Sequence, residues 1–120
     1  MKDMIMKPKI WLIIIAIMHT LMGVIGSYIT MGGSIDTLAI FLYMGTISVY
    51  LLYVAFMTEG QTQARLAAVL CVPIVVWFII GAIMNLDMLG VPVAEMPSGL
   101  LPITLWTLPA LTGIMNWNSE

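Results

Sequence analysis

The feature that most constrains this chain is a series of long apolar runs. The first, residues 10–29, holds about 20 residues, enough for one helix to cross the hydrocarbon core of a bilayer. Three further runs of similar length lie at about 37–57, 65–84 and 99–117. We therefore predict an all-α integral membrane protein, a four-helix bundle in which residues 1–120 form a single four-span transmembrane domain.

The composition also indicates a chain that is surrounded by lipid. It is 62% apolar and 8% charged, whereas soluble domains have about 25% charged residues. The formal net charge is -2 and there is no basic stripe, which excludes nucleic acid as a partner. The run after Lys7-Pro8-Lys9 is longer than the roughly 7 to 15 apolar residues of a signal peptide, so we expect an uncleaved first span. The expected partner is the lipid bilayer, and the expected location is the cell (inner) membrane, as a multi-pass protein.

Charged residues indicate how the spans are oriented. Four spans place every basic residue on the side of the N-terminus: Lys2, Lys7, Lys9 and Arg65. The connections on the opposite side carry only acidic charges: Asp36, Asp87 and Glu95. Because lysine and arginine are enriched in cytoplasmic loops, both the N-terminus and the C-terminus are predicted to be cytoplasmic.

A single histidine lies near the middle of the first run. Steps of three or four residues from it trace small and polar side chains along one helix face: Leu12, Ala16, His19, Gly23, Gly26 and Thr30. Small side chains let helices approach closely in lipid, so this stripe is expected to face protein. An ionisable residue inside a span also indicates a functional site.

The second run carries hydroxyl groups at the same spacing. They share one helix face with a small residue: Ala39, Tyr43, Thr46, Tyr50 and Tyr53. Lipid cannot hydrogen-bond a hydroxyl group, so we predict that this face turns inward.

Helical rise brings the polar groups to one level of the membrane. His19 lies about 13 Å into the first span, and on an antiparallel second span that depth falls near Ser48. The third and fourth spans reach it near Pro73 and Pro109, which are predicted to kink their helices. The candidate ligand-binding residues at this level are His19, Tyr43, Thr46, Tyr50, Trp77 and Trp106.

Two functions fit such a polar midplane. The first is a small accessory or structural protein, within a homo-oligomer or larger membrane complex, in which His19 fastens helices by bonding Tyr50 or Ser48. The second is binding or transport of a small apolar or aromatic ligand. That ligand is either quinone-like, with carbonyl oxygens bonded by His19 and Tyr50, or a haem. A haem would have His19 on the iron, with Met18 or Met44 as the second ligand or with the histidine of a second copy across a dimer. We prefer the first function and expect neither a cofactor nor another metal site.

Catalysis and ion-coupled transport find less support. No span contains a carboxylate, and no Ser-His-Asp set lies at one depth, so no enzyme is predicted. The small multidrug transporters resemble this chain in length and span count, but they carry a glutamate in span 1, where residues 16–22 offer only His19. A proton carried by His19 keeps transport open as an alternative.

The layout of the spans resembles a known group of proteins. His19-Thr20 and Gly23 lie in the first span, Trp77 in the third, and Pro97-Ser98-Gly99 opens the fourth. This arrangement resembles the small uncharacterised four-helix families grouped around DoxX-like bacterial membrane proteins. The resemblance concerns span order more than any motif, and it implies a four-helix membrane fold without a function or a site.

Overall fold

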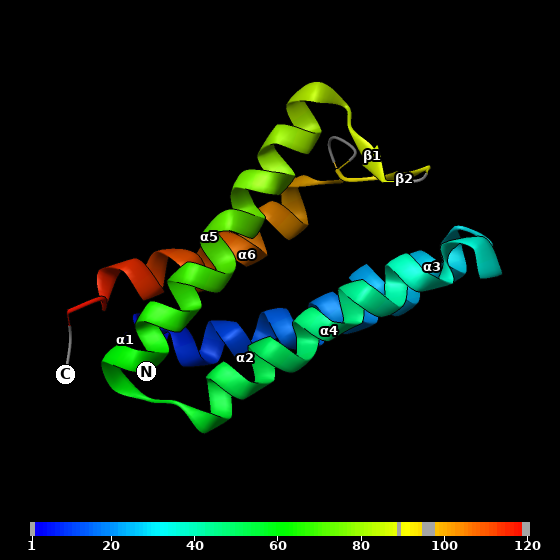
Figure 1. The fold of residues 1–120 in the computed structure, drawn as a ribbon. Coiled ribbons are helices and arrows are strands. Elements are labelled where there is room, and N and C mark those ends of the chain that lie inside the picture. The colour runs from blue at the N-terminus through cyan, green and yellow to red at the C-terminus, as the bar shows by residue number, and fades with distance from the viewer. Residues whose placement is uncertain (1, 89, 95–97, 119–120) are drawn as a thin grey trace.

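The structure is a computed structural model that describes residues 2–88, 90–94 and 98–118, with the side chains of Lys2 and Met4 left out. Four helical rods account for most of it (Figure 1). The first rod follows the short helix α1 (Lys2–Ile5) and has three parts: α2 (Pro8–Met18), η1 (His19–Gly26) and α3 (Ser27–Thr30). The other rods are α4 (Ile35–Met57), α5 (Gly60–Met84) and α6 (Leu100–Met115). Between α5 and α6, strands β1 (Asp87–Met88) and β2 (Val91–Pro92) pair as a small antiparallel hairpin.

The all-α prediction is confirmed, and three rods are long and apolar enough to cross a membrane. They contain 23, 23 and 25 residues. At about 1.5 Å per residue these rods are roughly 35 to 38 Å long, which exceeds the hydrocarbon thickness of about 30 Å. Helix α6 has only 16 residues, or about 24 Å, and is shorter than the predicted fourth span.

The helices pack as two hairpins, one made of α2–η1 and α4 and the other of α5 and α6. Helix α2 also packs against α6, while α5 touches α2 and α4 over a smaller area. In Figure 1 the hairpins lie together at the end that carries both chain termini and separate toward the end that carries β1 and β2. The hydrophobic core occupies the first of these two ends.

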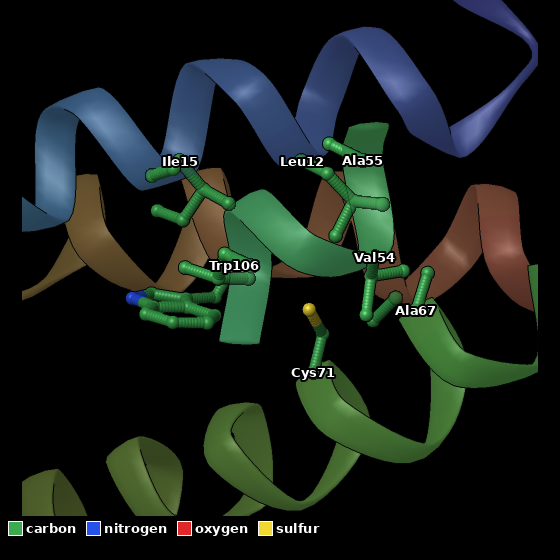
Figure 2. Packing of buried hydrophobic residues seen from close by; sticks show 10 residues of the cluster. Leu12, Ile15, Val54, Ala55, Ala67, Cys71 and Trp106 are labelled. Atoms are coloured by element: carbon green, nitrogen blue, oxygen red, sulfur yellow. The ribbon is translucent and has the colours of Figure 1, made fainter. Parts of the chain in front are cut away.

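The core is built from side chains of all four rods. Figure 2 shows Leu12 and Ile15 of α2 meeting Cys71 of α5 and Trp106 of α6, and each of these four side chains is at most 2% exposed. Val54 and Ala55 of α4 and Ala67 of α5 complete the labelled cluster: Leu12, Ile15, Val54, Ala55, Ala67, Cys71 and Trp106. The small residues among them let the helix backbones approach closely.

Helices α5 and α6 make their closest contact at Gly113. A Cβ atom at this position would lie 2.7 Å from the carbonyl oxygen of Ala64 and 2.8 Å from the amide nitrogen of Ala68. Backbone atoms cannot move aside as a flexible side chain can. Glycine is therefore required for this helix packing.

The turn between α4 and α5 is tighter than the sequence indicates. Helix α5 begins at Gly60, whose φ is 61°, ahead of the predicted start of the third span at about residue 65. Buried Gln63 donates from Nε2 to the carbonyl oxygens of Val54, Ala55 and Thr58, at 3.2, 3.0 and 3.0 Å. Such carbonyls at a helix end have no partner within their own helix, so Gln63 closes the turn by bonding them.

Pro73 and Pro109 both lie inside helices that continue beyond them. Pro73 is on an exposed face of α5, whereas Pro109 is buried among the helices. Their role as kinks stays a prediction.

Candidate functional site

The first rod changes its hydrogen-bonding pattern where His19 occurs. From His19 to Gly26 the backbone forms a π-helix, in which each bond reaches back five residues and the turn is wider. A Cβ atom at Gly26 would lie 2.9 Å from the carbonyl oxygen of Leu21, so glycine suits this turn. Ser27 Oγ donates to the carbonyl oxygen of Met22 at 2.9 Å. Segments of π-helix are rare and occur frequently at functional sites.

His19 is buried, with 7% of its side chain exposed. Its Nε2 lies 2.8 Å from the carbonyl oxygen of Met44 in α4. One residue further on, the hydroxyl groups of Thr20 and Ser48 are hydrogen-bonded to each other, with Oγ1 and Oγ 2.7 Å apart. The contact between Thr20 and Ser48 agrees with the prediction that His19 lies at about the depth of Ser48 in the membrane. The hydrogen-bond partner of His19 itself is the backbone carbonyl of Met44, instead of the predicted Tyr50 or Ser48. These two bonds tie the first rod to α4.

The other side of the histidine ring faces the second hairpin. The rings of His19 and Trp106 meet edge to face, with centroids 5.3 Å apart and planes inclined by 75°. Gly23 lies one turn along the first rod, and a Cβ atom there would be 3.2 Å from His19 Nδ1. Because Gly23 has no side chain, the space beside Nδ1 stays open.

A cavity of about 340 Å³ lies between the two hairpins, with His19 in its wall. The first hairpin contributes mainly apolar walls: Met18, Met22, Phe41 and Met44. The second hairpin closes the opposite side: Phe78, Leu105 and Trp106. This volume is within the range of about 300 to 1,000 Å³ found for small-molecule sites.

The segment that includes β2 forms part of the cavity wall. Val91, Pro92 and Val93 all line it. This segment approaches α5 at Gly81, where a Cβ atom would collide with Cγ1 of Val93. Gly81 therefore allows residues 91–93 to pack against the end of α5.

A second hollow, of about 840 Å³, adjoins the first and leads along η1 and α3. The two share wall residues from both hairpins, among them Met22, Ser27, Val93 and Pro102. The second hollow also reaches Leu21 and Met31, whose side chains are exposed. The second hollow therefore adjoins the cavity on the side of the exposed ends of η1 and α3.

The predicted inward orientation of the tyrosine face is wrong. The side chains of Tyr43, Tyr50 and Tyr53 are 71%, 55% and 57% exposed, and Thr46 is exposed and bonds only its own helix at the carbonyl oxygen of Tyr43. Helix α4 instead turns smaller and apolar side chains inward: Phe41, Ser48, Leu51, Val54 and Ala55. These side chains fit the close packing against α2 better than three phenol rings do.

Of the six candidate residues, the structure brings His19 and Trp106 together at the cavity. Trp77 is 38% exposed and packs edge to face on Phe78, which itself lines the cavity. Tyr43, Thr46 and Tyr50 lie away from it on α4. Met18 and Met44, which the sequence offered only as possible second ligands of a haem, both line the cavity. Sequence reasoning did not identify the backbone carbonyl of Met44 as the partner of His19.

The stripe around His19 is confirmed in its first half. Leu12, Ala16 and His19 are buried, but Thr30 is exposed. Gly23 lines the cavity, and Gly26 and Thr30 line the adjoining hollow, so the later part of the stripe also lies between the hairpins, at the end where they separate. In the motif that opens the last span, Pro97 lies outside the described residues, as does Glu95 of the acidic connections.

Among the described residues, no group of three or more histidine, cysteine, aspartate or glutamate side chains is placed to hold a metal ion. Comparison of the chain with family models, curated proteins and solved structures gives no match.

Proposed function

We propose that this chain is a four-span protein of the cell (inner) membrane that binds a small apolar or aromatic ligand between its two helical hairpins. The ligand occupies the cavity beside His19 and Trp106. The single observation that carries this proposal is that cavity, whose mainly apolar walls surround a histidine ring. Binding sites for small molecules have this composition, with a few polar groups that orient the ligand.

The outer surface of the helices supports the membrane location. Large apolar side chains such as Ile35, Leu42, Val69 and Ile83 are 62% to 82% exposed. Soluble monomers rarely expose apolar surface so continuously, whereas lipid tails cover it without cost. The longest extent of the fold is 45 Å, close to the roughly 40 to 45 Å of a bilayer with its headgroups.

Contacts at the ends of the rods support a fourth crossing with both termini cytoplasmic. Arg65 Nε donates to the carbonyl oxygen of Trp117 at 3.0 Å, and Asn116 Nδ2 donates to that of Met6 at 2.7 Å. The start of the first rod, the start of α5 and the end of α6 therefore lie together. Arg65 belongs to this end, as do the lysines that precede the first span, which agrees with a cytoplasmic face.

The geometry favours an organic ligand over haem. His19 Nε2 is engaged by Met44, which leaves Nδ1 for an iron atom. Nδ1 lies close beside Gly23 of its own helix, 3.2 Å from the position that a Cβ atom would take there. A porphyrin coordinated there would run into that helix turn, whereas a single polar group of a smaller ligand fits beside it.

We propose binding without catalysis. Of the described residues that line the cavity, His19 is the one titratable side chain. Acid–base chemistry normally needs a second group that accepts or supplies the proton. His19 orients a ligand and does not transform it.

A second candidate is the accessory or structural function, in which His19 and Thr20 only fasten the first rod to α4. The bonds to Met44 and Ser48 favour it. Under this alternative the cavity holds ordinary lipid chains and has no specific occupant.

Ligand extraction tests the proposal. The wild-type protein, purified in mild detergent, is analysed by mass spectrometry beside Leu101→Trp, which places a large side chain on the cavity wall. Leu100→Trp is the matched control, because Leu100 is similarly exposed, at 55% against 49%, and belongs to neither hollow. We expect a near-stoichiometric molecule in the wild type and in Leu100→Trp, with a several-fold loss in Leu101→Trp. Bulk phospholipid alone in all three samples would contradict ligand binding.

A further inference from the structure

The hydrogen bond to Met44 fixes the tautomer of His19. A backbone carbonyl oxygen can only accept, so Nε2, 2.8 Å away, must carry the proton. The described part of the cavity wall contains no carboxylate, and an unpaired charge in apolar surroundings is costly. An uncharged ring with its proton on Nε2 has a bare nitrogen at Nδ1, which is a hydrogen-bond acceptor.

Nδ1 has no hydrogen-bond partner within the described chain, where the interactions of His19 are those with Met44 and Trp106. Among the described residues, every fully buried side-chain nitrogen or oxygen atom has a hydrogen-bond partner. Since Nδ1 has none, it is not fully buried. Nδ1 is therefore accessible, and His19 is part of the cavity wall. The missing side chain of Gly23, 3.2 Å from Nδ1 at the Cβ position, keeps the approach open.

We propose that the ligand is a phenol or hydroquinone with an apolar tail, and that its hydroxyl group donates a hydrogen bond to His19 Nδ1. This inference rests on the proposed function of the same cavity. The aromatic ring of the ligand lies among Phe41, Phe78 and Trp106, and its tail follows the adjoining hollow along η1 toward lipid. An oxidised quinone has only acceptor oxygens, so it finds no donor at His19.

The requirement that the ligand donate a hydrogen bond to His19 reverses the sequence-based expectation for a quinone-like ligand. That expectation assigned His19 and Tyr50 as donors to carbonyl oxygens. In the structure Tyr50 lies on the outer face of α4, and the donor nitrogen of His19 is already engaged. The site therefore selects the hydroxylated form of such a molecule.

Two probes that differ in one group test this proposal. Saturable binding of 4-decylphenol and of its methyl ether, 4-decylanisole, is measured on the full chain in phosphatidylcholine nanodiscs, with empty nanodiscs as background. The anisole cannot donate a hydrogen bond to Nδ1, so we expect the phenol to bind roughly tenfold more tightly, a difference of about 1.4 kcal/mol.

Two variants test whether His19 Nδ1 accepts the hydrogen bond from the hydroxyl group of the phenol. His19→Phe keeps an aromatic ring beside Trp106 but has no acceptor. Gly23→Ala keeps the bond between His19 and Met44 and crowds Nδ1. We expect both variants to bind the two probes with equal affinity; Gly23→Ala keeps the test valid where His19→Phe does not fold.

The outcomes separate the two proposals. If the wild type binds 4-decylphenol and 4-decylanisole with equal affinity, the requirement for a hydroxyl donor is overturned and the proposed binding function stands. A phenol preference that survives in Gly23→Ala also overturns the assignment to Nδ1. Binding of neither probe above the empty-nanodisc background overturns the proposed function together with the inference.

Discussion

His19 and Trp106 meet edge to face, with their ring centroids 5.3 Å apart, and this contact joins the first hairpin to the second. The same imidazole is bonded to Met44 on α4. His19 therefore links the first rod to two other helices, α4 and α6. The bond to Met44 uses Nε2, and the ligand that we propose would bond Nδ1, so the two interactions would use different nitrogen atoms of one ring.

His19→Ala is expected to destabilise the protein by about 1 to 3 kcal/mol. The change removes a hydrogen bond worth about 0.5 to 1.5 kcal/mol and an aromatic pair of similar value. Denaturant unfolding in detergent micelles, followed by circular dichroism, measures the loss. A variant as stable as the wild type would show that these contacts do not hold the hairpins together.

Tyr43→Phe and Tyr50→Phe are expected to change the free energy of unfolding by less than about 0.5 kcal/mol each. Both phenol rings are more than half exposed, and neither hydroxyl group bonds within the described chain. Substitutions at such positions are usually close to neutral. The same unfolding assay applies, and a loss of about 1 to 3 kcal/mol for either variant would restore the inward-facing arrangement predicted from the sequence.

Gly113→Ala should separate α5 from α6 and cost roughly 1 to 3 kcal/mol, as overpacking does in other cores. The added Cβ atom would lie 2.7 Å from a backbone oxygen of Ala64. Gly45→Ala is the matched control, because its Cβ atom would meet Val24 only at 4.0 Å. The control should be neutral or slightly more stable, since alanine is the better helix former. Equal thermal stability of the two variants would contradict the close approach at Gly113.

Cysteine labelling tests the orientation of the spans. Ser34→Cys, Thr62→Cys and Asn118→Cys each place a thiol at an exposed position outside the apolar core, while the chain's one natural cysteine, Cys71, is buried. We expect a membrane-impermeant maleimide to label only Ser34→Cys in intact cells, and the other two after permeabilisation. The parent protein is the control for background. External labelling of Asn118→Cys would mean that α6 does not cross the membrane.

The helical rods were predictable because the length and hydropathy of an apolar run determine whether it forms a membrane-spanning helix. Apolar runs of this length form helices wherever lipid is the solvent, since each backbone group must then be bonded within its own segment. The burial of His19 followed from the small residues beside it. Helix boundaries in the structure differ from the predicted ones by only a few residues, except at the start of α5.

The orientation of α4 was not predictable in the same way. Its inner and outer faces are both apolar, so the polar side chains were the available clue, and they pointed to the wrong face. The contribution of residues 91–93 to the cavity depends on Gly81 and Val93, which are far apart along the chain. The π-helix was also missed, because an analysis that assumes regular helical spacing cannot detect a wider turn.

Nitrogen-15 NMR of histidine-labelled protein in nanodiscs tests the central claim most directly, since the chain has one histidine. We predict a ring that carries its proton on Nε2, and an Nδ1 resonance that moves on addition of 4-decylphenol but not of 4-decylanisole. A proton on Nδ1, or an Nδ1 resonance that neither compound moves, would contradict a site in which His19 offers this nitrogen to a ligand.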